Sequence, residues 1–107
     1  MPVLWSEAVI PITERDFQKT VLDMARFFGW KDYFSWSSLH SPRGFPDLVL
    51  ARERDGVVRL VFVELKSEKG KLTEAQCEWL DLLAKVPGVE AHCFKPSDWS
   101  QIEGTLR

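Results

Sequence analysis

The fold is decided by the stretch DLVLARERDGVVRLVFVELK, residues 47–66. Two apolar, β-branched runs, Asp47 to Arg54 and Val57 to Lys66, flank the dipeptide Asp55-Gly56. An Asp-Gly pair between two such runs is the strongest short-range signal of a β-hairpin with a two-residue loop. We therefore predict two antiparallel strands, paired from Arg54 opposite Val57 to Leu48 opposite Val63.

This register brings two carboxylates face to face. It continues to Asp47 opposite Glu64, and opposed residues have Cβ atoms about 5 Å apart, where two carboxylates repel unless a positive charge lies between them. Lys66 follows Glu64 by two residues, so strand alternation projects it from the same face. The sequence thus predicts that Asp47, Glu64 and Lys66 converge at one end of the hairpin.

Two carboxylates beside an amine suit a hard divalent cation. Magnesium is typically held by one or two carboxylates together with waters and substrate phosphate oxygens. Such a metal polarises a phosphoryl oxygen and lowers the pKa of bound water, while a nearby lysine orients the attacking water or neutralises developing charge. We therefore predict phosphodiester hydrolysis at Asp47, Glu64 and Lys66. The alternative is a half-exposed strand whose terminal charges only meet solvent.

The flanking sequence predicts helices on a mixed sheet. Thr13 is a candidate N-cap for a helix over 14–28, and the capping box at Thr73 opens a helix over 74–86. Strands are predicted over 33–38 and 90–94, and Ser97 is the expected cap of a last helix. The strand-helix-strand step to residue 94 implies a right-handed crossover. The expected fold is α/β, in the order α-β-β-β-α-β-α.

Composition sets the wider limits. The chain has 107 residues, 45% hydrophobic and 28% charged, which is typical of one soluble domain over 1–107, with 1–12 as an irregular amino-terminal arm. The formal net charge is −2, so no global basic field indicates nucleic acid, although basic residues exceed acidic ones between residues 40 and 71. No leader or membrane span is evident, so we expect a cytoplasmic protein. Cys77 and Cys93 are expected to be reduced core residues.

Two further side chains are candidates for the site. Glu14 shares a helix face with Val21 and Ala25, at the edge of the predicted apolar stripe, from which it could approach the metal. A first-turn glutamate can equally well serve only to complement the helix dipole. Gln76 is either an active-site residue or simply the capping-box partner of Thr73.

Polar and basic residues flank the predicted site in loops. These are candidates for contacts with a nucleic-acid backbone, which position a substrate without reading its sequence. They are His40, Ser41, Arg43, Lys69 and Lys71. The alternative is ordinary solvated loop charge, and His40 is at most a weak general-base candidate. We interpret the five tryptophans as core residues rather than as residues that stack on bases.

Three linked motifs resemble the virus-type replication-repair nuclease (VRR-NUC) family of the PD-(D/E)XK nuclease superfamily. The resemblance covers about residues 13–96. The motifs are Gly44-Phe45-Pro46-Asp47-Leu48-Val49-Leu50, Val63-Glu64-Leu65-Lys66-Ser67 and Lys69-Gly70-x-Leu72-Thr73-x-x-Gln76. The resemblance implies a restriction-endonuclease-like α-β-β-β-α-β core and a magnesium- or manganese-dependent endonuclease that acts on DNA.

The resemblance also implies roles for single residues. Asp47, Glu64 and the backbone carbonyl of Leu65 would bind the metal, and Lys66 would be the catalytic lysine. Glu14 would match the family's helix-one acid and would approach the metal directly or through a water; Glu7 is the alternative placement. Gln76 would match the helix glutamine.

The resemblance extends to partners. Stand-alone members are similar to phage or bacterial junction-resolving nucleases that work as dimers, which implies branched DNA as substrate and a homodimer, with no organic cofactor and no membrane. The first alternative is a catalytically silent nuclease-fold module that binds DNA or protein. A second, less favoured alternative is hydrolysis of RNA or nucleotides.

Overall fold

The structure, a computed structural model, describes residues 13–34 and 43–107. The helices are α2 (Glu14–Phe27), α3 (Glu74–Ala84) and α4 (Trp99–Leu106), with a short 3₁₀ turn, η2 (Pro96–Asp98), before α4. The strands are β1 (Lys31–Phe34), β2 (Leu48–Arg54), β3 (Val57–Leu65) and β4 (Val89–Phe94). They form one mixed sheet in the order β1-β2-β3-β4, in which only the β3–β4 pair is parallel. The predicted α/β fold and element order are confirmed.

The hairpin has the predicted register. Arg54 pairs with Val57, and the ladder continues to Leu48 opposite Val63. Both loop residues adopt positive φ, 53° at Asp55 and 80° at Gly56, which is the conformation that a type I′ turn requires. Because β2 begins at Leu48, Asp47 lies one residue before the strand rather than inside it.

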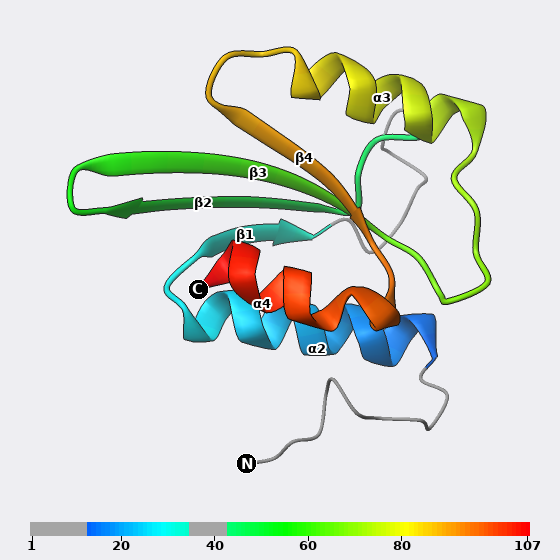
Figure 1. The fold of residues 1–107 in the computed structure, drawn as a ribbon, viewed down its shortest axis with the longest axis horizontal. Helices are drawn as coiled ribbons and strands as arrows, with labels where there is room; N and C mark the ends of the chain where they lie inside the picture. The colour runs from blue at the N-terminus through cyan, green and yellow to red at the C-terminus, as the bar shows by residue number, and fades with distance from the viewer. Residues whose placement is uncertain (1–12, 35–42) are drawn as a thin grey trace.

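The core fills one side of the sheet. Helices α2 and α4 lie side by side over this face, and α3 lies over the opposite face (Figure 1). Alternate residues of β2 and β3 project toward α2 and α4 and are fully buried: Leu48, Leu50, Val61, Val63 and Leu65. By strand alternation, Glu64 and Phe62 project to the α3 face. The site is therefore built on the side of the sheet that the core leaves free.

Helix α2 begins where its cap predicts. The Thr13 hydroxyl accepts a hydrogen bond from the Asp16 amide at 3.1 Å, and Phe17, Val21 and Ala25 recur at helical spacing on the buried side. The helix ends at Phe27, one residue before the predicted end.

Helix α3 differs from the other two helices. Its capping box is formed as predicted, but the helix ends at Ala84, two residues early, and none of its residues is completely buried. It rests on β4 and β3 by half-buried contacts.

Ser97 does not cap the last helix, contrary to the prediction. It lies inside the 3₁₀ turn, where its amide and hydroxyl both donate to the Glu68 carboxylate, at 3.0 and 2.7 Å. Helix α4 begins two residues later, at Trp99. Lys95, Pro96 and the side chain of Asp98, which accepts from the Lys95 amide at 2.8 Å, set the turn instead.

The carboxyl ends of α2 and α4 are joined to the hairpin by arginines. Arg52 donates to the carbonyl oxygens of Phe28 and Leu106, at 3.0 and 2.9 Å. The Leu106 carbonyl also accepts from the Trp30 indole at 2.8 Å, and the guanidinium groups of Arg52 and Arg59 stack on the Trp30 ring. Carbonyls at a helix carboxyl end lack partners within the helix, so these cations satisfy them.

Other predictions are met in part. Strand β1 begins two residues before the predicted 33–38 segment, and residues 35–38 lie outside the described part of the chain. Cys93 is half-buried, but Cys77 is exposed, so its assignment to the core is wrong; both are free thiols. Among the described residues, no helix is long and apolar enough to cross a membrane.

Candidate active site

Asp47 is joined to the end of β3 by a backbone hydrogen bond. The Leu65 amide donates to Oδ2 of Asp47 at 3.0 Å. Pro46, which is fully buried, fixes the entry into β2 without supplying an amide to the sheet. The carboxylate that precedes one strand is thereby held beside the last residues of the neighbouring strand, as the hairpin register predicts.

Glu64 is the one charged residue in the buried set of the described chain. Its exposed fraction is 3%, and its Oε2 accepts a hydrogen bond from Gln76 Nε2 at 3.0 Å. Lys66 Nζ lies 3.8 Å from the same oxygen. The structure therefore brings Asp47, Glu64, Lys66 and Gln76 together on the α3 side of the sheet.

The environment of Glu64 favours its neutral form. Burial, together with charge repulsion from the adjacent Asp47, raises the pKa of Glu64 to about 8, and Lys66 opposes the shift. Desolvation and like charge both disfavour ionisation. An opposing positive charge is needed to keep both carboxylates ionised at neutral pH.

Asp47 is shifted in the same direction. Burial raises the pKa of Asp47, while the hydrogen bond from the Leu65 amide lowers it. Burial therefore disfavours the ionised form of both carboxylates when no cation lies between them.

The donor set fits a divalent metal. Glu64 Oε1 is buried and has no hydrogen-bond donor among the described residues. An unpartnered anionic oxygen beside a second carboxylate is costly unless a cation occupies the position. Oxygen ligands are those that Mg²⁺ and Mn²⁺ prefer. Asp47, Glu64 and the Leu65 carbonyl would hold such an ion, with waters completing its shell.

Glu14 lies near the pair without joining it. It is exposed in the first turn of α2, and its charge raises the pKa of both Asp47 and Glu64. Within residues 13–34 and 43–107, however, no three His, Cys, Asp or Glu side chains are close enough to bind one metal by themselves. Contact of Glu14 with a metal would therefore run through a water.

The predicted substrate-contact residues fall into two groups. Arg43, Lys69 and Lys71 are exposed in the loops that precede Asp47 and follow Lys66. His40 and Ser41 lie outside the described residues.

The sequence assigned no separate role to three residues around the site: Gly44, Phe45 and Trp79. The Trp79 indole donates to the Arg43 carbonyl at 3.1 Å, and the Phe45 ring contacts the rings of both Trp79 and Phe62. Trp79 follows Gln76 by one helical turn, which is the signal that could have placed it on the same face.

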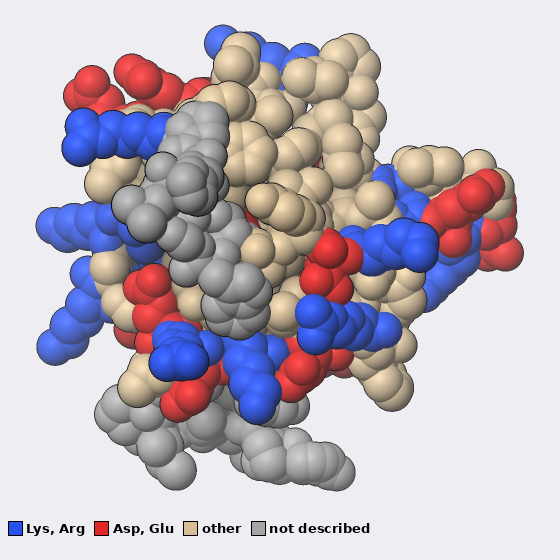
Figure 2. Space-filling model, turned by 180° about the vertical axis from the view of Figure 1, so that it is seen from behind, with Lys and Arg blue, Asp and Glu red and all other residues tan. Residues whose placement is uncertain are grey.

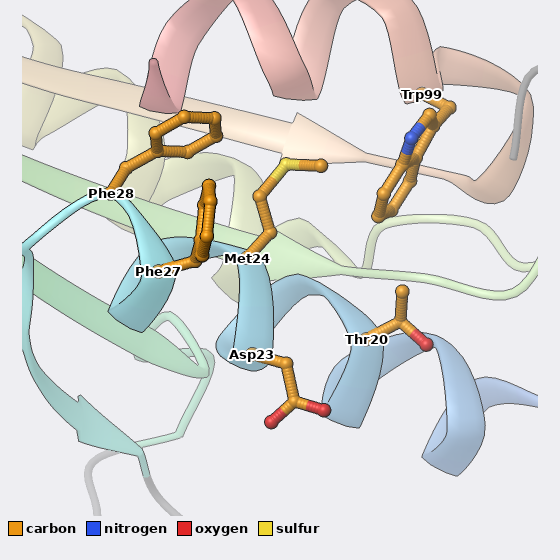
Figure 3. A pocket seen from close by; sticks show the side chains of 6 residues that line it. All are labelled: Thr20, Asp23, Met24, Phe27, Phe28 and Trp99. Atoms are coloured by element: carbon orange, nitrogen blue, oxygen red, sulfur yellow. The ribbon is translucent and has the colours of Figure 1, made fainter. Parts of the chain in front are cut away.

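A separate apolar hollow lies between α2 and α4, away from the carboxylates (Figure 3). It is lined by Thr20, Asp23, Met24, Phe27, Phe28 and Trp99. Asp23 is the one carboxylate in this lining, and no lysine or arginine is part of it. The hollow therefore does not repeat the arrangement of Asp47, Glu64 and Lys66.

Comparison with known proteins identifies the family and the fold. A search of curated proteins gives no significant match. A solved structure described as a VRR_NUC domain protein superposes with a TM-score of 0.66, at 21% sequence identity, over 91% of this chain and 87% of that one. The model of the VRR-NUC domain matches residues 12–94. The chain therefore belongs to the VRR-NUC family and carries a nuclease domain.

Proposed function

We propose that this protein is a divalent-metal-dependent endonuclease that hydrolyses phosphodiester bonds in DNA. The observation that carries the proposal is the buried carboxylate pair of Asp47 and Glu64, with Lys66 at its edge and one Glu64 oxygen without a donor among the described residues. A bound Mg²⁺ or Mn²⁺ supplies Lewis acidity toward a phosphate oxygen and an activated water.

The chain's own residues have distinct tasks in this proposal. Asp47 and Glu64 provide the anionic oxygens, and the Leu65 amide and Gln76 fix their directions. Lys66 places a positive charge at the mouth of the pair, where it orients a water or offsets charge that develops on the phosphate. Burial removes competing water from Glu64.

The surface charge supports local rather than global attraction of DNA. On the face shown in Figure 2, basic and acidic side chains are interspersed and not separated by sign. The exposed cations Arg43, Lys69 and Lys71 border the site. Each phosphate that such a group contacts makes binding weaken as salt rises.

The proposal extends to the substrate's shape and the working assembly. A single site cuts one strand, so resolution of branched DNA in a replication or repair setting calls for two copies acting as a homodimer. We place this activity in the cytoplasm. DNA is present there, and cysteines such as the free Cys77 and Cys93 stay reduced in that compartment.

A substrate panel with matched variants tests the proposal. The purified chain is incubated with duplex, flap and four-way-junction DNA and with RNA, in magnesium, in manganese and in chelator. We expect metal-dependent nicking of DNA, strongest on the branched substrates, and its loss in Asp47→Asn, Glu64→Gln and Lys66→Met with circular dichroism spectra unchanged. Cutting by Glu64→Gln at the parent rate would overturn the mechanism, and DNA binding without any cutting would favour a silent module.

A further inference from the structure

The loop that precedes Asp47 is fastened to α3 at three points. Gly44 has a φ of +81° and comes so close to α3 that an added Cβ would lie 2.5 Å from the Ala75 backbone carbon. The Arg43 carbonyl accepts the Trp79 indole hydrogen bond at 3.1 Å. The Phe45 ring meets the Trp79 ring edge-on, with centroids 4.9 Å apart. The backbone that carries Asp47 is therefore seated on this helix.

The same helix also holds the second carboxylate. Gln76, one turn before Trp79, donates to Glu64 Oε2 at 3.0 Å. Residues three apart on a helix project from the same side. One turn of α3 thus contacts both arms of the site: Glu64 directly through Gln76, and Asp47 indirectly through the loop that Trp79 holds.

Helix α3 is held by half-buried contacts rather than by a buried apolar face. None of its residues is completely buried, whereas α2 and α4 each bury several apolar side chains in the core. The contacts with Arg43, Gly44 and Phe45 accordingly add to the few that hold its amino-terminal half over the site.

We propose that Trp79 is a positioning residue for the carboxylate pair: by clamping the loop of residues 43–46 to α3, it sets Asp47 at the distance from Glu64 that a shared metal requires. The inference rests on the proposed function. Trp79 contacts neither carboxylate itself, so its effect travels through the loop backbone.

The first test needs no metal. Because the Leu65 amide donates to Asp47, its hydrogen-exchange rate, measured by NMR on the chelator-treated protein, reports whether Asp47 is in place. Trp79→Phe keeps a ring against Phe45 but removes the indole N–H. We expect exchange at Leu65 to accelerate about fivefold, the effect of losing one hydrogen bond, relative to amides at the centre of β3.

Trp30→Phe is the matched control. It removes an indole-to-carbonyl hydrogen bond of 2.8 Å, from Trp30 to Leu106 at the carboxyl end of α4. If Trp79 contributes only to general stability, both substitutions should change hydrogen exchange at Leu65 equally. The proposal predicts that only Trp79→Phe accelerates exchange at Leu65.

A second pair of variants tests the loop from its other side. Gly44 and Gly88 share a φ of +81°, but a Cβ at Gly88 meets nothing within 4 Å. Gly44→Ala and Gly88→Ala therefore carry the same backbone strain, and only Gly44→Ala pushes the loop off α3. We expect only Gly44→Ala to loosen Leu65.

Calorimetric titration with manganese completes the test. Trp79→Phe should bind Mn²⁺ about tenfold more weakly, as removal of a supporting residue typically does, and saturating metal should restore the maximal cutting rate. Equal Leu65 exchange and equal Mn²⁺ affinity in Trp79→Phe and Trp30→Phe would overturn the positioning role of Trp79 and leave the proposed function standing. Absence of Mn²⁺ binding by the unsubstituted protein would instead overturn the proposed function together with this inference.

Discussion

Glu64 Oε2 accepts a hydrogen bond of 3.0 Å from Gln76, while the side-chain oxygen of the same Gln76 accepts from the Thr73 amide at 2.8 Å. The sequence left capping and an active-site role as alternatives for Gln76, and in the structure one side chain makes both the cap and a hydrogen bond to Glu64. The amino end of α3 and the buried carboxylate are thus linked by a single amide group.

Removal of this link should affect metal binding more than helix stability. Gln76→Ala loses the contact with Glu64 and half of the capping box, whereas Thr73→Ala disturbs only the cap. We expect both to cost about 1 kcal/mol of unfolding free energy, measured in urea. Only Gln76→Ala should weaken Mn²⁺ binding, by about tenfold in calorimetry. Equal losses of affinity would mean that Gln76 acts through the cap.

The stability of the metal-free protein should fall as pH rises through neutrality. The pKa of Glu64 is raised to about 8 from an ordinary 4.5, so between these values the folded state binds more protons than the unfolded state. The stability that protonated Glu64 contributes is fully present below its ordinary pKa of 4.5 and is lost as the pH rises through about 8. The free energy of unfolding falls by at most about 1.4 kcal/mol per pH unit over this range.

Urea unfolding in chelator over this pH range checks the sign. Glu64→Gln, which carries no titratable group, should flatten the profile, and saturating Mn²⁺ should reverse it because the metal binds the ionised pair. A stability that rises over the same range in the metal-free protein would show that Glu64 is ionised without metal.

Lys66 should be required for cutting but not for metal binding. Lys66 lowers the pKa of Glu64, so Lys66→Met should shift metal binding to higher pH and abolish nicking at saturating Mn²⁺. Lys85→Met, an exposed lysine after α3, is the control and should cut at the parent rate. Parent-level nicking by Lys66→Met would remove the lysine from the reaction.

The Arg59–Glu90 pair should stabilise the sheet in a pH-dependent way. Its N–O distances are 2.7 and 2.8 Å, and the hydrogen bond from Arg59 lowers the pKa of Glu90. The contribution is present above the ordinary pKa of glutamate and is lost as pH falls through the lowered value. Glu90→Gln should cost about 1 kcal/mol in neutral urea unfolding and progressively less in acid. Glu103→Gln, in the exposed pair with Arg107, should cost less at every pH.

Local sequence was sufficient for the hairpin and for the site at its end. The Asp55-Gly56 turn defines the register, and the period of a strand then determines which side Glu64 takes. The N-cap at Thr13 and the capping box at Thr73 likewise depend on residues within one helical turn. For these features the residues that determine the structure lie within a few positions of one another in the sequence.

Long-range contacts could not be predicted in the same way. The hydrogen bond from Trp79 ends on a backbone carbonyl 36 residues away, and every residue type offers that carbonyl. Strand β1 begins at Lys31 because Ala51 pairs with it, and Ser97 turns to Glu68 rather than to α4. In each case the partner that decides the structure is distant in sequence, so no local pattern indicates it.

The most direct test of the central claim is a calorimetric Mn²⁺ titration of the protein and of Asp47→Asn, run in two buffers of different ionisation enthalpy. We predict saturable binding that releases protons near neutral pH, because the pair must ionise to bind, and loss of binding in Asp47→Asn with unfolding still cooperative. Binding of equal strength in the variant, or binding without proton release, would contradict the claim that Asp47 and Glu64 together hold the ion.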